Sequence, residues 1–129
     1  MRRRKLEEAS RVRGELRQAW QQMGTFLERL GGRSVLVRGT LYERRRRCGR
    51  RGCRCERGGL HVSEAFCVSQ AGRTKHLRLQ GVNRERLREG VENYRRFRAA
   101  RRQLRATCWR LLALADQMEQ VRCVSLEEL

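Results

Sequence analysis

The stretch "RRRRCGRRGCRCERGGLH" spans residues 44–61 and decides how the chain folds. It carries three cysteines and one histidine in the spacing Cys48-x4-Cys53-x-Cys55-x5-His61. Three thiolates and one imidazole are a usual ligand set for structural zinc, which binds four nitrogen or sulfur ligands in a tetrahedron. Glycines inside the stretch allow the chain to turn back tightly around an ion. The pattern therefore predicts a zinc site made by Cys48, Cys53, Cys55 and His61.

Other interpretations of these cysteines stay open at the level of sequence. Cys67 lies in the next predicted strand and is an alternative fourth ligand to His61. The cysteines can also be free thiols, or Cys53 and Cys55 a redox pair, although a disulfide across so short a separation is strained. A catalytic zinc ion is disfavoured, because four protein ligands leave no open position for water. The nearest carboxylates also form no recognisable acid–base arrangement, so we do not expect an enzyme.

The same stretch is rich in arginine, with eight arginines and two glutamates between residues 43 and 57. A zinc ion with three thiolates carries a single net negative charge, which needs few of these arginines for neutralisation. Arginine binds phosphate oxygens in bidentate geometry, so the surplus predicts contacts with a nucleic-acid backbone. The predicted contact residues here are Arg44, Arg45, Arg46, Arg47, Arg50, Arg51, Arg54 and Arg57.

A second group of arginines lies on a predicted C-terminal helix, where residues 84–110 contain ten arginines and three glutamates. A solvated face with ordinary intrahelical ion pairs is the alternative to a binding role. The predicted contact residues of this group are Arg84, Arg88, Arg95, Arg98 and Arg102. Tyr42, beside the first arginine run, is the only plausible base-stacking residue. This disfavours a base-stacking platform and favours backbone contact with little sequence readout.

The overall charge supports an anionic partner. The chain of 129 residues has 32 Lys and Arg against 14 Asp and Glu, a net charge of +18. Codon bias explains the preference for arginine over lysine but not the surplus of positive charge. We therefore expect a nucleic-acid partner, DNA slightly ahead of RNA, within a larger nucleoprotein complex. The alternative function is a protein interaction module whose basic surface docks on an acidic partner.

The compartment is inferred from what the sequence lacks. The basic first residues lead into no apolar segment, which disfavours a signal peptide, and no apolar run approaches the roughly 18 residues of a membrane span. We expect a reducing cytoplasm and no membrane partner. Closely spaced cysteines in that compartment are more often metal ligands than disulfides.

Two long helices are predicted on either side of the cysteine-rich stretch. Residues 6–30 show a heptad seam of Leu16, Trp20, Met23, Leu27 and Leu30, ended by two glycines. The second helix begins after an N-cap at Asn83 and extends to about residue 122. Its apolar seam is Leu87, Val91, Tyr94, Phe97, Leu104, Cys108, Leu111, Ala115 and Met118. Gly90 is tolerated there at about 1 kcal/mol.

Between the helices, residues 34–42, 65–70 and 74–80 alternate in the manner of strands. The predicted fold is α+β: an antiparallel two-helix hairpin or coiled coil, with a small antiparallel sheet and the zinc-stapled loop inserted between the helices. Residues 1–32, 33–81 and 82–129 are its three parts in one domain. Because so short a chain buries only a small core, we expect stabilisation by the metal or by a homodimer through the helix seams.

The chain also contains three motifs, which are RGTLYE at residues 38–43, C-G-x-x-x-C-x-C-x-x-G-x-x-H at 48–61 and ENYRR at 92–96. In them the chain resembles a family of small, uncharacterised prokaryotic proteins over roughly residues 36–110. The resemblance supports His61 as the fourth ligand. It implies no established activity, because the family is a domain of unknown function. The family continues His-Gly-Pro-Tyr where this chain reads HVSE, and this chain adds Cys67, which keeps the alternative ligand open.

Overall fold

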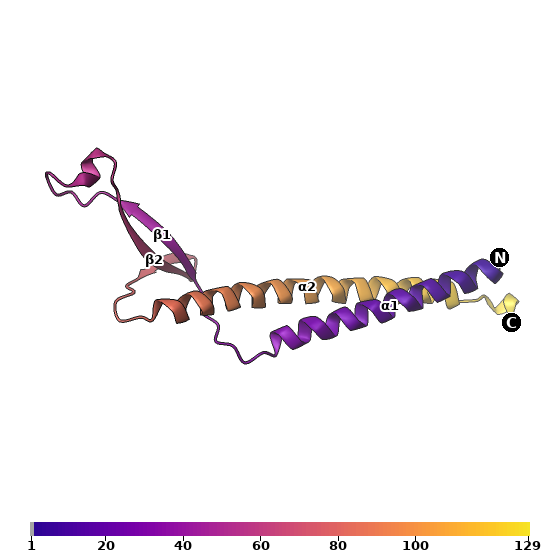
Figure 1. Cartoon of the computed structure of the whole chain (residues 1–129). Coiled ribbons are helices and arrows are strands. Elements are labelled where there is room, and N and C mark those ends of the chain that lie inside the picture. The colour runs from indigo at the N-terminus through magenta and orange to yellow at the C-terminus, as the bar shows by residue number, and fades with distance from the viewer. Residues whose placement is uncertain (1) are drawn as a thin grey trace. The chain divides into compact units, whose positions relative to one another are not determined.

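The computed structural model describes residues 2–129 (Figure 1). In chain order its elements are α1 (Arg2–Leu30), β1 (Thr40–Arg46), the short 3-10 helix η1 (Arg54–Arg57), β2 (His61–Gln70), β3 (Arg73–Leu77), α2 (Arg84–Arg122) and the 3-10 helix η2 (Leu126–Glu128). The α+β fold is therefore confirmed, with the sheet and the Cys/His loop inserted between two helices. Within residues 2–129, no helix is both long and apolar enough to cross a bilayer.

The chain forms two compact units, each with its own core. The first, which we call the helical unit, contains α1 and the part of α2 from Arg96 onward. The second, the sheet unit, comprises Ser34–Arg95 and so contains the three strands, the Cys/His loop and the first part of α2. Helix α2 is continuous through both units.

In the helical unit, α1 and the second part of α2 pack with opposite chain directions (Figure 1). The centre of this packing is formed by Val12, Ala19 and Leu114. The less exposed apolar positions of α1 step by three and four residues and are Ala9, Val12, Leu16, Ala19, Met23, Phe26 and Leu30. Those of α2 step in the same way and are Phe97, Ala100, Leu104, Leu111, Leu114, Met118 and Val121, with the buried polar residue Thr107 on the same stripe. A heptad pattern of burial therefore runs along both helices, while supercoiling of the pair stays a prediction.

The predicted seam is wrong at its bulkiest residues. Trp20 is 66% exposed and Leu27 is 50% exposed, although both belong to the predicted seam. On α2, Cys108 and Ala115 are exposed as well. The buried stripe uses small side chains such as Ala19 instead, because small residues allow two helix backbones to come close together. The sequence prediction followed the large apolar residues, so it found Leu16, Met23 and Leu30 of the buried stripe but chose Trp20 and Leu27 in place of Ala19 and Phe26.

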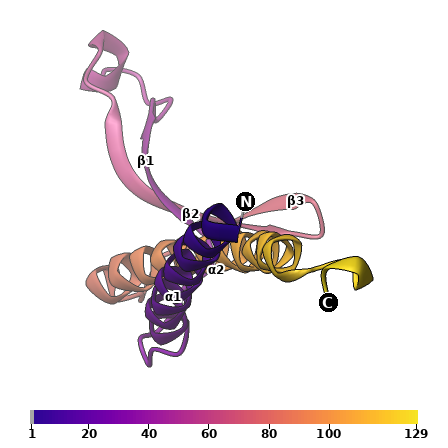
Figure 2. The same ribbon diagram turned by 90° about the vertical axis from the view of Figure 1, so that its right-hand side faces the viewer.

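The sheet has the order β1-β2-β3 with both pairs antiparallel, and Figure 2 shows β3 from a second direction. The prediction of a strand over residues 34–42 is largely wrong, because β1 begins only at Thr40 and continues into the arginine run. The preceding segment bonds to α2 instead. The N–H of Val37 donates to the carbonyl of Gly90 at 2.9 Å, and Nδ2 of Asn93 donates to the carbonyl of Val35 at 3.2 Å.

Gly90 makes this close approach to α2 possible. A Cβ atom at position 90 would overlap the side chain of Val37. The glycine is therefore required by packing, and the prediction that it is merely tolerated was wrong. The predicted N-cap is confirmed, since the N–H of Arg86 donates to Oδ1 of Asn83 at 3.0 Å. The core of the sheet unit is Phe66, Leu79, Leu87 and Val91, with Val37, Leu41 and Val68 packed against it.

The strands present different residues on their two faces. One face carries Leu41, Phe66 and Val68, which pack in the core with the residues of α2. The register and the two-residue alternation of strands place a second set on the opposite face, which we call the open face. That set includes Tyr42, Arg44, Arg46, His61, Ser63, Ala65, Cys67 and His76.

Candidate metal centre

The Cys/His loop connects the ends of β1 and β2. Arg46 pairs with His61 across the two strands, so residues 47–60 leave and re-enter the sheet at neighbouring positions. Cys48 follows the end of β1, Cys53 is the N-cap of η1, Cys55 lies within η1, and His61 is the first residue of β2. Figure 1 shows this loop, with η1 in it, at the tip of the β1–β2 hairpin. The hairpin thus brings together ligands from both sides of the loop.

The loop backbone is fixed by its own turns. Gly49 and Gly52 adopt φ angles of 77° and 76°, a left-handed conformation that residues with a Cβ atom rarely adopt. Gly58 ends η1 in the same conformation. Within the loop, the N–H of Glu56 donates to the carbonyl of Cys53 at 3.0 Å. These turns point the cysteines of the loop toward one another.

The four predicted ligands lie together. One ligand atom from each of Cys48, Cys53, Cys55 and His61 lies within 4.8 Å of all the others. The Sγ atoms of Cys48 and Cys55 are 3.6 Å apart, and Cys53 Sγ is 3.2 Å from His61 Nε2. Tetrahedral zinc would require about 3.8 Å and about 3.6 Å for such pairs. The four side chains can therefore hold a metal ion with shifts of about 1 Å or less.

Burial and polarity within the cluster are uneven. Cys55 is fully buried, Cys53 and His61 are half-buried, and Cys48 is exposed. The pKa of the Cys55 thiol is lowered to about 7, first by the backbone N–H of Cys48 and then by hydrogen bonds from Cys53, Cys48 and His61, against the opposing effect of burial. Thiolate is the form that binds metal. The innermost cysteine is thus the one most ready to ligate.

At Cys53 the net shift has the opposite direction, and the pKa of the thiol is raised. The backbone N–H of Cys55 lowers the pKa of this thiol, but side-chain hydrogen bonds to Cys55 and Cys48, partial burial and repulsion from Cys48 together raise it. These opposite directions follow from three thiols close together, because the first thiolate disfavours the next. A bound cation would remove that conflict.

Cys67 is not a member of the cluster. It pairs with Thr40 and His76, six residues along β2 from His61, which corresponds to about 20 Å of strand. The structure thus brings His61, and not the alternative Cys67, to the other three ligands. Cys67 is a half-buried free thiol, and Cys108 and Cys123 are exposed free thiols.

All eight predicted contact arginines between residues 43 and 57 are exposed. One of them, Arg45, forms an ion pair with Glu43 at 2.9 Å. In the part of the chain that the structure describes, the other seven have no carboxylate within ion-pair distance. Arg44, Arg45 and Arg46 belong to β1, so the arginine run begins within the sheet rather than in the loop.

The predicted arginines of α2 fall into two groups. Arg88 donates to Glu64 from Nε at 3.1 Å and from Nη2 at 2.5 Å, and Arg84 lies 3.9 Å from the same carboxylate. Arg95 pairs with Glu92 on its own helix at 3.9 Å. Arg98 and Arg102 are exposed, and within residues 2–129 neither takes part in an ion pair. Only this last pair is fully available to an external anion.

Tyr42 has a partner that sequence reasoning missed. Its hydroxyl lies 3.2 Å from Nδ1 of His76, and the two rings meet edge to face with centroids 6.4 Å apart. The contact crosses β2 near Ala65, whose small side chain leaves room for the tyrosine ring. Strand alternation places Tyr42 and His76 on the open face, but only the register of two strand pairs reveals that they meet.

Comparison of the chain with models of protein families, with curated proteins and with solved structures finds no match. The motif resemblance over residues 36–110 therefore stays a prediction. What the chain does has to be inferred from the geometry of its own residues.

Proposed function

We propose that the metal is zinc and that its role is structural. Three cysteines and one histidine are a zinc ligand set, and softer or harder metals prefer other donors. The ligands come from a loop with little apolar content, where a bound ion replaces the missing core. In a reducing cytoplasm, where these cysteines would otherwise be free thiols, the ion would bind them.

On this basis we propose a non-enzymatic accessory protein that binds the phosphate backbone of nucleic acid. This proposal is carried by seven exposed arginines that lack a carboxylate partner. They lie in the Cys/His loop, called the metal loop from here on, or at the end of β1 beside it. Exposed guanidinium groups form bidentate bonds with phosphate oxygens. A loop held by a metal loses little conformational entropy when it binds, which favours such contacts. Arg98 and Arg102 would add contacts from the helical unit.

The test is fluorescence anisotropy with a labelled DNA duplex at about 0.1 M salt. We expect micromolar or tighter binding by the wild-type protein. The double variant R50Q/R51Q should bind at least tenfold more weakly. The matched control is R13Q/R17Q, which removes the same charge from exposed positions of α1. Absence of binding by the wild type would refute the proposal, and equal losses in both variants would show that the loop is not the contact site.

A second candidate function, a protein interaction module, is favoured by the exposed apolar residues of the helical unit. Trp20 and Trp109 are 66% and 64% exposed, and Leu112 is 59% exposed. Tryptophan dominates binding energy in protein interfaces, and large exposed apolar residues often mark them. The basic surroundings suit a partner helix with an apolar stripe and acidic flanks.

This candidate is tested with a synthetic amphipathic helix whose polar face is glutamate. Binding should shift the tryptophan emission of the full-length protein, and W20S should weaken it at least tenfold while leaving the affinity for DNA unchanged. A wild-type emission spectrum that does not change at high micromolar peptide would exclude this function.

A further inference from the structure

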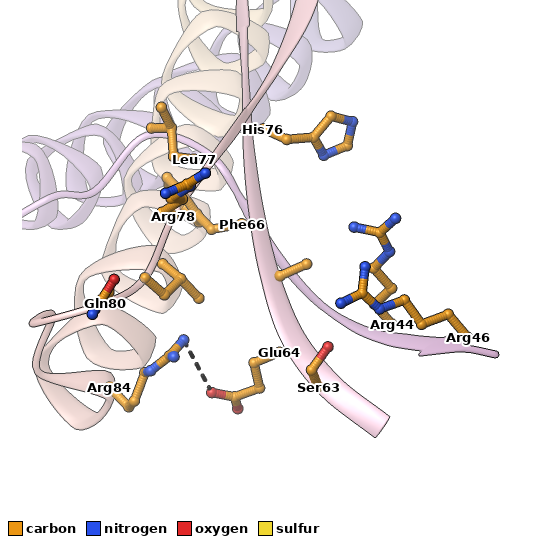
Figure 3. Close-up of a pocket in the computed structure, with 12 residues that line it drawn as sticks. Arg44, Arg46, Ser63, Glu64, Phe66, His76, Leu77, Arg78, Gln80 and Arg84 are labelled. Atoms are coloured by element: carbon orange, nitrogen blue, oxygen red, sulfur yellow. Dashed lines mark ion pairs between the residues drawn. The ribbon is translucent and has the colours of Figure 1, made fainter. Parts of the chain in front are cut away.

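The sheet unit contains a cavity of about 500 Å³ that belongs to neither the metal centre nor the helical unit (Figure 3). It forms because β3 is shorter than β2. β3 pairs with residues 66–70 of β2, so residues 61–65 have a strand neighbour on one side only. The chain that leaves β3 then passes through residues 78–80 toward α2, and these residues line the cavity as well.

The cavity is strongly basic. Four arginines line it, Arg44 and Arg46 from β1, Arg78 from the segment after β3, and Arg84 from the first turn of α2. Figure 3 shows Arg44 and Arg46 on one side of β2 and Arg78 and Arg84 on the other. Glu64 is the only carboxylate in the lining. The walls therefore carry a surplus of positive charge that suits an anion with more than one negative charge.

Arg84 has an unused donor in this cavity. Its Nη1 atom is shielded from solvent and donates no hydrogen bond to any described residue. The nearest carboxylate oxygen, on Glu64, is 3.9 Å away, which is too long for a hydrogen bond. Glu64 is instead held by two bonds from Arg88. A shielded cationic donor without an acceptor is costly, so this atom points to an anionic ligand.

The remaining lining indicates what the anion is attached to. Leu77, which is 39% exposed, provides most of an apolar wall beside the arginines, whereas Phe66 and Leu79 also line the cavity but are only 6% and 8% exposed. A free inorganic ion would gain nothing from that wall, whereas an organic group bonded to a phosphate would lie against it. The volume of about 500 Å³ is within the range of sites for small organic ligands.

We propose that this cavity binds a phosphate monoester, with Arg84 and Arg78 holding the phosphate and the apolar wall contacting the attached group. The ligand is a nucleotide unit, either free or at the phosphorylated end of a nucleic-acid strand. Arg44 and Arg46, which line the cavity on the other side of β2, would contact another phosphate of such a strand. This site differs from the backbone contacts proposed above, because it discriminates a terminal phosphate from a hydroxyl.

The test is isothermal titration calorimetry of the metal-loaded full-length protein with four probes: AMP, adenosine, and a single-stranded hexanucleotide with either a 5′-phosphate or a 5′-hydroxyl. We expect the 5′-phosphate oligonucleotide to bind at least tenfold more tightly than its 5′-hydroxyl counterpart. AMP that binds while adenosine does not would assign the site to free nucleotides as well. An AMP that fails to bind, with the oligonucleotide preference intact, would assign it to strand ends alone.

Variants separate the cavity from the backbone contacts. R84Q should abolish the preference for the 5′-phosphate, and R78Q provides a second, independent variant outside the helix in case R84Q disturbs folding. R86Q is the matched control, because Arg86 is exposed on the same helix turn and does not line the cavity. R50Q/R51Q should weaken both oligonucleotides equally if the proposed function is right. The cavity proposal is overturned if the 5′-phosphate and 5′-hydroxyl oligonucleotides bind with equal affinity and AMP does not bind, whatever the loop variant does. It is also overturned if both R84Q and R78Q keep the preference for the 5′-phosphate unchanged.

Discussion

The two units of this protein obtain their structure in different ways. In the helical unit, a seven-residue repeat along two helices defines a buried stripe centred on Val12, Ala19 and Leu114. In the sheet unit, four buried residues form a small core, and fourteen residues between β1 and β2 have no core of their own apart from Cys55. The first unit is specified by many weak, periodic contacts. In our proposal the second depends on a few strong contacts between four ligand atoms and a metal ion, and the two units should therefore fail under different perturbations.

The largest effect is expected on removing the metal from the sheet unit. Ligation by such a set contributes about 10–16 kcal/mol to folding in zinc-finger peptides. C55S removes the buried ligand and should abolish stoichiometric zinc, measured by elemental analysis. It should also remove the folded-state amide signals of residues 47–60 from NMR spectra. The helical circular dichroism should change little, because the helical unit has a separate core. C67S is the control, and it should retain one zinc ion per chain.

A core truncation in the helical unit should have a smaller effect on stability. It should also affect unfolding of the helices and leave zinc binding unchanged. Leu114 is 3% exposed, and truncation of such a leucine costs about 2–5 kcal/mol. L114A should therefore lower the midpoint of thermal unfolding followed by helical circular dichroism, while the zinc content stays at one per chain. L112A removes the same atoms from a side chain that is 59% exposed and should cost well under 1 kcal/mol. Loss of zinc in L114A would mean that the two units are not independent.

The same substitution, glycine to alanine, compares the two units at one helix position in each. G90A should destabilise the protein by about 1–3 kcal/mol, because its Cβ overlaps Val37. G14A should stabilise it by up to about 1 kcal/mol, since nothing lies within 4 Å of a Cβ there and alanine is the better helix former. Urea unfolding curves measure both. Stabilisation by G90A would show that the segment before β1 does not pack on α2.

The smallest expected effect is at the start of α2. N83A removes the side chain that accepts the N–H of Arg86, and loss of such a cap costs about 1 kcal/mol. N83D keeps the acceptor and should cost less than half as much. If the two variants prove equally unstable in urea, the cap does not account for where this helix begins.

Local chemistry made part of this structure predictable from sequence. The four ligand side chains lie within fourteen residues, so their spacing alone indicated that they meet. The bounds of α2 followed from one N-cap and from an uninterrupted helical pattern. In each case the deciding residues are close together in the chain.

Features that depend on distant residues were less predictable. Trp20 and Ala19 lie on adjacent stripes of α1, and only the partner helix decides which stripe is buried. Residues 34–38 alternate like a strand, yet their hydrogen bonds go to Gly90 and Asn93 on α2. Arginines 44–46 carry no strand signal of their own and join the sheet through pairing with residues 61–63.

The most direct test of the central claim, that the arginines of the metal loop contact nucleic-acid phosphates, is the salt dependence of DNA binding. The logarithm of the association constant should fall linearly with the logarithm of salt concentration, and each lost phosphate contact reduces the slope by about 0.9. The triple variant R50Q/R51Q/R54Q should therefore bind with a slope about 2.7 units shallower than that of the wild type. A slope that is the same in both proteins would contradict the account.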